Sequence, residues 1–275
     1  MIIWLASYPK SGNTWVRSFL CSYIYSKKKE FEFDILKKIP LFPKFNQFLQ
    51  VGNKPVNFDE VAESWIPAQE YINLNNKINF LKTHSALGTY KNFPFTNKEN
   101  TLGAIYLVRD PRDVLISYSK YLNLPLNETL KMMSTKDDMG ALDLSKSNLA
   151  GEVRGDWGQH YNSWKNFPYG SALIVKYEYL LSNTFDCFKG IVKYLNKICD
   201  LEINDDRIKE CIEMVNFSNL KKLEQKVGFK ENLYNKNNQP FFNVGKSKQW
   251  EKCDTEVINN LEKLFNKTMK ELKYI

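Results

Sequence analysis

The chain has 275 residues, of which 43% are hydrophobic and 14% aromatic, enough for a substantial core in one large domain or two small ones. No apolar run approaches the roughly 18 residues of a membrane-spanning helix, and no basic region precedes the apolar N-terminal stretch, so we expect no signal peptide. Five cysteines without CxxC or Cys/His spacing favour reduced thiols in a cytoplasmic protein over disulfides or a zinc site. The net charge of +8 suits an anionic ligand, but the scattered lysines argue against a nucleic-acid-binding stripe.

Residues 2–8 form the first predicted element, an apolar run with the length of a buried strand. Turn-forming residues interrupt the run over residues 9–13, and apolar residues at helical spacing resume at residue 15. A strand, a tight polar loop and a helix are typical of phosphate sites, because free backbone N–H groups at the helix N-terminus point at the anion. In the Walker pattern the lysine directly follows a glycine, whereas here it precedes one, so an ordinary strand–turn–helix is the alternative. The candidate phosphate-binding residues are Lys10, Ser11, Gly12, Asn13 and Thr14.

Residues 27–78 follow the first predicted helix and show no strong periodicity, with prolines and aromatic residues spread along them. This composition predicts short helices joined by loops. Such a segment forms either the wall of an acceptor pocket or a peripheral cap on the core, and the sequence leaves both open.

Two further buried strands are predicted at residues 78–84 and 101–108. In an open parallel sheet, ligands bind at the carboxyl ends of the strands, which places Lys82, His84 and Arg109 at a candidate site. A lone histidine is structural more often than catalytic, so both interpretations of His84 stay open here. The guanidinium of Arg109 offers a rigid fork of donors that suits a phosphate, and an ion pair with a nearby aspartate is the alternative.

The C-terminal half continues the alternation of strands and helices. A helix within residues 151–164 carries three aromatic residues on one face, which indicates packing, and its His160 is predicted to be a partly buried structural histidine. Residues 123–150 are polar, and Asp137, Asp138 and Gly140 mark a loop between helices. The other predicted elements are a strand at 172–178, amphipathic helices at 184–199 and 205–215, a mobile loop at 225–249 and a closing helix at 254–272.

Buried strands separated by helices predict an α/β fold, P-loop-like and three-layered, with a central parallel sheet flanked by helices. No repeat or linker divides the chain. We therefore expect one domain over residues 1–275, with residues 31–75 and 225–249 as mobile cap or acceptor loops.

These motifs, in this order, resemble the soluble sulfotransferase family in its bacterial style, whose members use 3′-phosphoadenosine 5′-phosphosulfate (PAPS) as donor. Residues 8–15 resemble the family's loop for the 5′-phosphosulfate, and residues 106–118 resemble its 3′-phosphate segment. Residues 82–84 are similar to the strand that carries the catalytic histidine, residues 176–178 to a strand ending in a nucleotide-contacting tyrosine, and residues 245–250 to the loop that closes over the 3′-phosphate.

The resemblance implies a role for each matched residue. His84 would take the proton from the acceptor hydroxyl, Lys10 would hold the bridging and sulfonate oxygens, and Lys82 would assist at the sulfonate. Adenosine 3′,5′-bisphosphate (PAP) would be the product, and no metal is expected. The implied nucleotide site comprises the loop residues Lys10, Ser11, Gly12, Asn13 and Thr14, the adenine-covering Trp15 and Phe217, the contacting Tyr177, and the 3′-phosphate ligands Arg109, Ser117, Gly245 and Lys246.

Three positions depart from the family pattern. Asn243 and Val244 stand where a basic pair is usual, and Lys248 stands where glycine is common. The family's short dimerisation motif is also not preserved, so the oligomeric state stays open. The expected acceptor is a hydroxyl (or amine) of a small molecule, natural product or glycan. The alternatives are a P-loop-type nucleotide kinase, which requires a Gly-Lys-Ser/Thr loop and a magnesium-binding aspartate, and a basic nucleic-acid-binding module.

Overall fold

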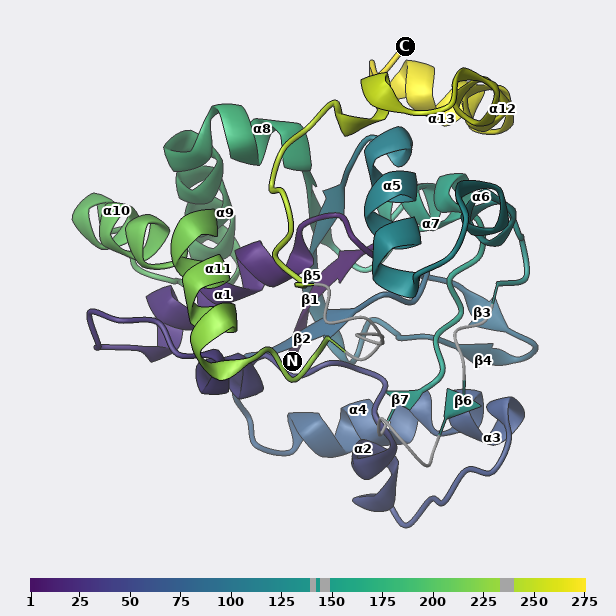
Figure 1. Cartoon of the computed structure of the whole chain (residues 1–275). Helices are drawn as coiled ribbons and strands as arrows, with labels where there is room; N and C mark the ends of the chain where they lie inside the picture. The colour runs from purple at the N-terminus through teal and green to yellow at the C-terminus, as the bar shows by residue number, and fades with distance from the viewer. Residues whose placement is uncertain (139–141, 144–148, 233–239) are drawn as a thin grey trace.

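A four-stranded parallel sheet lies at the centre of the computed structural model, which describes residues 1–138, 142–143, 149–232 and 240–275 (Figure 1). The strand order is β2-β1-β5-β8, and every neighbouring pair is parallel. The sheet confirms the predicted α/β class. Its strands are β1 (Ile2–Ser7), β2 (Asn79–Thr83), β5 (Thr101–Val108) and β8 (Ser171–Lys176).

Helices cover both faces of the sheet (Figure 1), so the central strands β1 and β5 are buried on both faces. Alternate residues of β1 enter different cores: Ile3 and Leu5 face one, and Ile2 and Trp4 face the other. The first core is closed by α1 (Asn13–Tyr25), α8 (Tyr177–Ser182), α9 (Thr184–Cys199), α10 (Asp205–Met214) and α11 (Phe217–Val227). The second is closed by α4 (Trp65–Asn73), α5 (Pro111–Leu122), α6 (Leu126–Met133), α7 (Trp157–Lys165), α12 (Thr255–Leu264) and α13 (Asn266–Glu271).

The segment between α1 and β2 consists of short helices and loops, as its composition predicts. Several of its aromatic residues pack into the cores on either side of the sheet. No helix in the described part of the chain is long and apolar enough to cross a membrane. The remaining elements are η1 (Phe33–Lys38), α2 (Phe45–Leu49), α3 (Phe58–Glu63), β3 (Thr89–Tyr90), β4 (Phe93–Pro94), β6 (Leu142–Asp143), β7 (Leu149–Ala150) and η2 (Gln249–Lys252).

Several predicted boundaries were wrong. The last strand ends at Lys176, which pairs with the final residue of β5, so Tyr177 has no strand partner and begins α8. Helix α7 begins only at Trp157, where Asp156 and Gln159 form a capping box. The loop expected from 225 begins after α11, and the closing helix is two helices. Helix α6 lies within the polar stretch 123–150, before the expected loop between helices. Parts of the two predicted loops, 139–141, 144–148 and 233–239, lie outside the described residues.

Candidate active site

A cavity of about 490 Å³ opens at the carboxyl ends of the central strands. Two of the predicted site residues do not line it: Ser11, which is fully buried, and Lys246, whose side chain is exposed. The predicted residues that the structure brings together around the cavity are Lys10, Gly12, Asn13, Thr14, Trp15, Lys82, His84, Arg109, Ser117, Tyr177, Phe217 and Gly245.

The loop between β1 and α1 has a backbone that only a few residue types adopt readily. Gly12 caps α1 with φ of 95°, and a Cβ atom there would lie 2.5 Å from Cδ2 of Tyr177. Both the backbone conformation and the tyrosine ring therefore require glycine. The hydroxyl of Ser11 is buried and has no hydrogen-bond partner among the described residues. Buried polar groups are rarely left unpaired, so this hydroxyl is a candidate donor to a bound anion.

The side chain of Asn13 ties the loop to β1. Its amide donates to the carbonyl oxygen of Leu5 and to the hydroxyl of Ser7, both at 3.1 Å. These bonds tie the start of α1 back to β1. The donors that the helix offers to a ligand are thus its N-terminal backbone N–H groups and the nearby hydroxyl of Thr14.

Lys10 is the cation at the centre of the cavity. Its ammonium lies between two rings, 3.9 Å from the centroid of Phe241 and 4.2 Å from that of Tyr121. Burial, together with the charges of Arg109 and Lys82, lowers its pKa to about 7. Neither ring carries a negative charge, so a bound anion would stabilise the protonated form of Lys10.

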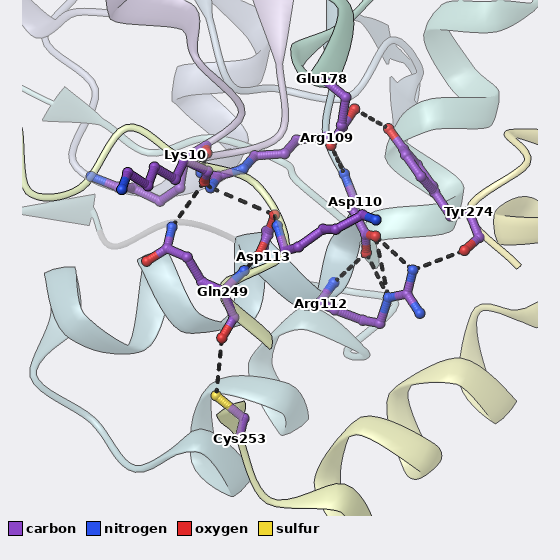
Figure 2. A network of polar contacts seen from close by, with 11 residues as sticks. Lys10, Arg109, Asp110, Arg112, Asp113, Glu178, Gln249, Cys253 and Tyr274 are labelled. Carbon is purple, nitrogen blue, oxygen red and sulfur yellow. Dashed lines mark hydrogen bonds and ion pairs between the residues drawn. The ribbon is translucent and has the colours of Figure 1, made fainter. Parts of the chain in front are cut away.

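Arg109 connects three segments at the tip of β5 (Figure 2). Its guanidinium donates to the carbonyl oxygens of Lys10 and Lys246, both at 3.1 Å, and lies 4.4 Å from the ring centroid of Tyr177. Its Nε atom is buried without a partner among the described residues. The expected alternative, an ion pair with an aspartate, is present only as a long contact of 4.0 Å to Asp113. Arg109 is therefore placed to offer a further donor to an anion.

Asp113 fixes the C-terminal loop to α5. Its two carboxylate oxygens accept the backbone N–H groups of Lys248 and Gln249, each at 2.8 Å. The carboxylate is buried, which raises its pKa. At Gly245 in the same loop, φ is 63° and a Cβ atom would lie 2.5 Å from the ring of Phe217, so this position also requires glycine. Lys246 takes part through its carbonyl oxygen, while its side chain is exposed.

The last residues of the chain reach the same strand tip (Figure 2). The hydroxyl of Tyr274 donates to Glu178 at 3.0 Å, and Glu178 accepts the backbone N–H of Asp110 at 2.9 Å. Arg112 bonds the carboxylate of Asp110 and, at 2.8 Å, the carbonyl oxygen of Tyr274. Its guanidinium also stacks 3.8 Å from the ring centroid of Trp250. The C-terminus thereby braces the segment that carries Arg109.

His84 extends past β2 and has a defined tautomer. Its Nδ1 atom lies 2.7 Å from the carbonyl oxygen of Ser7, and because a carbonyl only accepts, Nδ1 carries the proton. Burial, and then the charge of Lys82, lower the pKa of His84 well below its usual value. The imidazole is consequently neutral at pH 7, with the lone pair on Nε2. Among the described residues none hydrogen-bonds to Nε2, and the side chain lines the cavity.

His160 holds the backbone of His84 in place. It is fully buried, accepts from the hydroxyl of Tyr106 at 3.0 Å, and donates from Nε2 to the carbonyl oxygen of His84 at 3.1 Å. Burial lowers its pKa to about 3. The sequence indicated a partly buried histidine, whereas the structure buries it completely.

The sequence did not single out three charged residues that line the cavity: Glu152, Arg154 and Glu231. Glu152 accepts the backbone N–H of His84 at 3.1 Å, and Arg154 donates to the hydroxyl of Tyr118 at 2.6 Å. The alternation of Glu152 and Arg154 around a valine is a signal that could have indicated an extended segment with two charged groups on one face. Glu231 stands in a segment without periodicity and gave no signal.

A parallel sheet with an anion-binding loop, a neutral imidazole and buried cations at its strand tips defines the class of nucleotide-dependent group-transfer enzymes. The family model for the sulfotransferase domain matches residues 2–273, and the chain belongs to that family. It is a PAPS-dependent sulfotransferase, and the kinase alternative is not favoured.

Individual relatives are distant but cover most of the chain. Sulfotransferase 1A1 of Rattus norvegicus is 23% identical over 262 residues, covering 93% of this chain and 79% of the relative. The amine sulfotransferase of Oryctolagus cuniculus is 22% identical over 286 residues, covering 99% and 83%. The solved structure of mouse sulfotransferase SULT7A1 complexed with PAP superposes with a TM-score of 0.62 at 21% identity, covering 98% and 84%, and so shares the fold.

Proposed function

We propose that this chain transfers the sulfuryl group of PAPS, in line, to an acceptor hydroxyl or amine, with His84 as the general base. The observation that carries the proposal is the tautomer of His84. Its Nδ1–H is held by the carbonyl oxygen of Ser7, which leaves Nε2 unprotonated, and the side chain lines the cavity. A base of this kind removes the acceptor proton as the new bond to sulfur forms.

The residues around the phosphate loop fit the donor nucleotide. Ser11 and Arg109 each keep a buried polar atom without a partner among the described residues, and both atoms suit anionic oxygens. Arg109 and Ser117 would hold the 3′-phosphate, and Trp15 and Phe217 would cover the adenine. When bound, PAPS supplies the sulfuryl group and leaves as PAP. The solved structure of SULT7A1 is a complex with PAP, which agrees with this donor.

Lys10 and Lys82 would stabilise the charge that develops during transfer. Both side chains line the cavity with His84 before any substrate arrives, and the anionic donor would keep Lys10 protonated once it is bound. Fixed charge at the point where charge develops needs no reorganisation, and removal of one such group typically lowers kcat by about 10²- to 10³-fold.

The acceptor is proposed to enter on the side of the cavity lined by Leu41, Lys44, Glu152 and Phe241. These residues belong to the segments expected to form acceptor loops, and to the extended stretch before α7. Of the relatives, one is named an amine sulfotransferase, which agrees with a small-molecule acceptor carrying a hydroxyl or an amine. The mixture of apolar and charged lining suits a ring-bearing acceptor with polar substituents.

The test combines nucleotide binding with transfer. PAP should raise the melting temperature of the wild type, and labelled PAPS should sulfonate members of an acceptor panel. H84A should abolish transfer and leave the Kd for PAP unchanged, because His84 makes no contact with the nucleotide in this mechanism. As a matched control, H160Q changes the other histidine and should retain measurable transfer. A wild type that PAP does not protect would refute the donor assignment, and full activity of H84A would refute the base.

A further inference from the structure

Arg17, Glu231 and Lys82 form an ionic cluster at the cavity, in which Arg17 and Lys82 are buried and Glu231 is 35% exposed. The mechanism above gives Arg17 and Glu231 no role. The side chain of Arg17 is 2% exposed. Its Nη1 atom donates to both carboxylate oxygens of Glu231, at 2.7 and 2.8 Å. Its Nε and Nη2 atoms donate to the carbonyl oxygens of Ile39 and Leu36, at 2.7 and 2.8 Å. Four hydrogen bonds thus fix the guanidinium of Arg17 against the carboxylate.

The same carboxylate faces Lys82. Oε2 of Glu231 lies 3.6 Å from Nζ of Lys82, and the lysine side chain is only 10% exposed. This contact is an ion pair and is longer than a hydrogen bond, and the lysine lines the cavity, where its ammonium can donate to a ligand. The contact joins β2 to the segment after α11, which are far apart in the sequence.

The electrostatic surroundings of Lys82 are otherwise unfavourable to its charge. Burial lowers its pKa, and Glu231 is the largest opposing influence. Burial alone would raise the pKa of Glu231, but Lys82 and Arg17 lower it to about 2, so the carboxylate stays ionised. The titratable and charged groups that face Lys82 or its carboxylate partner from the packed segments are Lys10, Arg17, Lys44, His84, Glu152 and Glu231.

We propose that Glu231 is a positioning residue for sulfuryl transfer: held by Arg17, it fixes the ammonium of Lys82 beside His84 and keeps it protonated for the sulfonate. The inference rests on the proposed function of Lys82. Glu231 itself contacts neither donor nor acceptor in this role, and it acts through the lysine.

The direct test titrates Lys82 without any turnover. Brief acetylation with acetic anhydride at a series of pH values, followed by peptide mass spectrometry, gives the midpoint at which Lys82 becomes reactive. E231Q should lower this midpoint by about 1 to 3 pH units, because an opposite charge has been removed. E224Q is the matched control. Glu224 accepts the backbone N–H groups of Phe241 and Phe242, and removal of its charge should leave the midpoint of Lys82 unchanged.

The kinetic test asks whether this charge matters for transfer. In E231Q, kcat should fall by roughly tenfold per pH unit above the lowered midpoint, whereas a merely structural role would lower kcat equally at all pH values. E231D keeps the charge and should restore part of the alkaline activity. In the background of K82M, E231Q should add no further pH dependence.

The two tests fail in distinguishable ways. An unchanged Lys82 midpoint in E231Q, or in E231A if E231Q does not fold, would overturn the inference even if the enzyme transfers sulfuryl groups. A wild type without transfer would refute the proposed function, while the acetylation experiment would still decide the role of Glu231 toward Lys82.

Discussion

Lys10 makes nucleotide binding depend on pH in a direction that the structure fixes. Its pKa in the free protein is about 7, because the side chain is buried and faces Arg109 and Lys82. Above pH 7 the side chain is therefore largely neutral. Its amino group lies over the rings of Tyr121 and Phe241. A bound phosphate favours the protonated form, so PAP must bind together with a proton.

The size of the effect follows from this linkage. With a pKa of about 7 for Lys10 in the free protein, raising the pH from 7.5 to 8.5 should weaken PAP binding about eightfold. The limit for uptake of one proton is about tenfold in Kd, or about 1.4 kcal/mol, per pH unit. The phosphate groups of PAP do not contribute, because their second pKa lies near ~6. His84 is neutral throughout this range and also does not contribute.

Isothermal titration calorimetry in two buffers of different ionisation enthalpy measures both the Kd and the proton uptake. The wild type should take up close to one proton at pH 8.5. K10M should bind PAP more weakly at pH 7, with proton uptake reduced, and R109K serves as a control that weakens binding but retains Lys10. Equal proton uptake in K10M and in the wild type would refute the assignment of the titrating group to Lys10.

Three further predictions follow from other contacts. G245A should weaken PAP binding at least tenfold by calorimetry, because φ of 63° and a Cβ at 2.5 Å from Phe217 both oppose it; an unchanged Kd would contradict the close ring contact. D113N should lower the melting temperature and the PAP affinity, since one of two backbone N–H groups at 2.8 Å loses its acceptor. An unpaired buried donor should cost about 1–3 kcal/mol of stability. The control is D206N, which changes an exposed carboxylate. The free energy of unfolding should fall by about 2 kcal/mol from pH 7 to pH 5 through His160 alone. The pKa of His160 is about 6.5 in the unfolded chain and lower in the folded protein, so stability is lost as the pH falls below the unfolded value. Urea unfolding of H160Q should lack this part of the pH dependence.

The sheet could be predicted because its strands are continuous apolar runs that are buried on both faces. The ends of the elements were harder to predict, since they depend on partners elsewhere in the chain. Tyr177 continues an apolar run, yet it begins a helix because β5 provides no partner beyond Val108. The start of α7 was likewise set by a capping box at Asp156, not by its aromatic face.

The predicted site residues were those at strand tips, where the pattern of strand, loop and helix indicates a ligand. Which part of each residue faces the cavity could not be read from the sequence. Asn13 turns its amide toward β1, and Lys246 contributes a carbonyl oxygen. Glu231 reaches Lys82 across 149 positions of the chain, a contact that no local pattern encodes.

The brace formed by Tyr274 has a practical consequence. Its carbonyl oxygen bonds Arg112, and its hydroxyl reaches the carboxylate that holds Asp110 next to Arg109. Loss of Tyr274, for example by proteolysis, would therefore act on the nucleotide-binding segment from outside the cavity. A preparation in which part of the molecules lack Tyr274 would behave as a mixture of enzymes with different affinities for PAP, so intact mass should be measured before binding curves are interpreted.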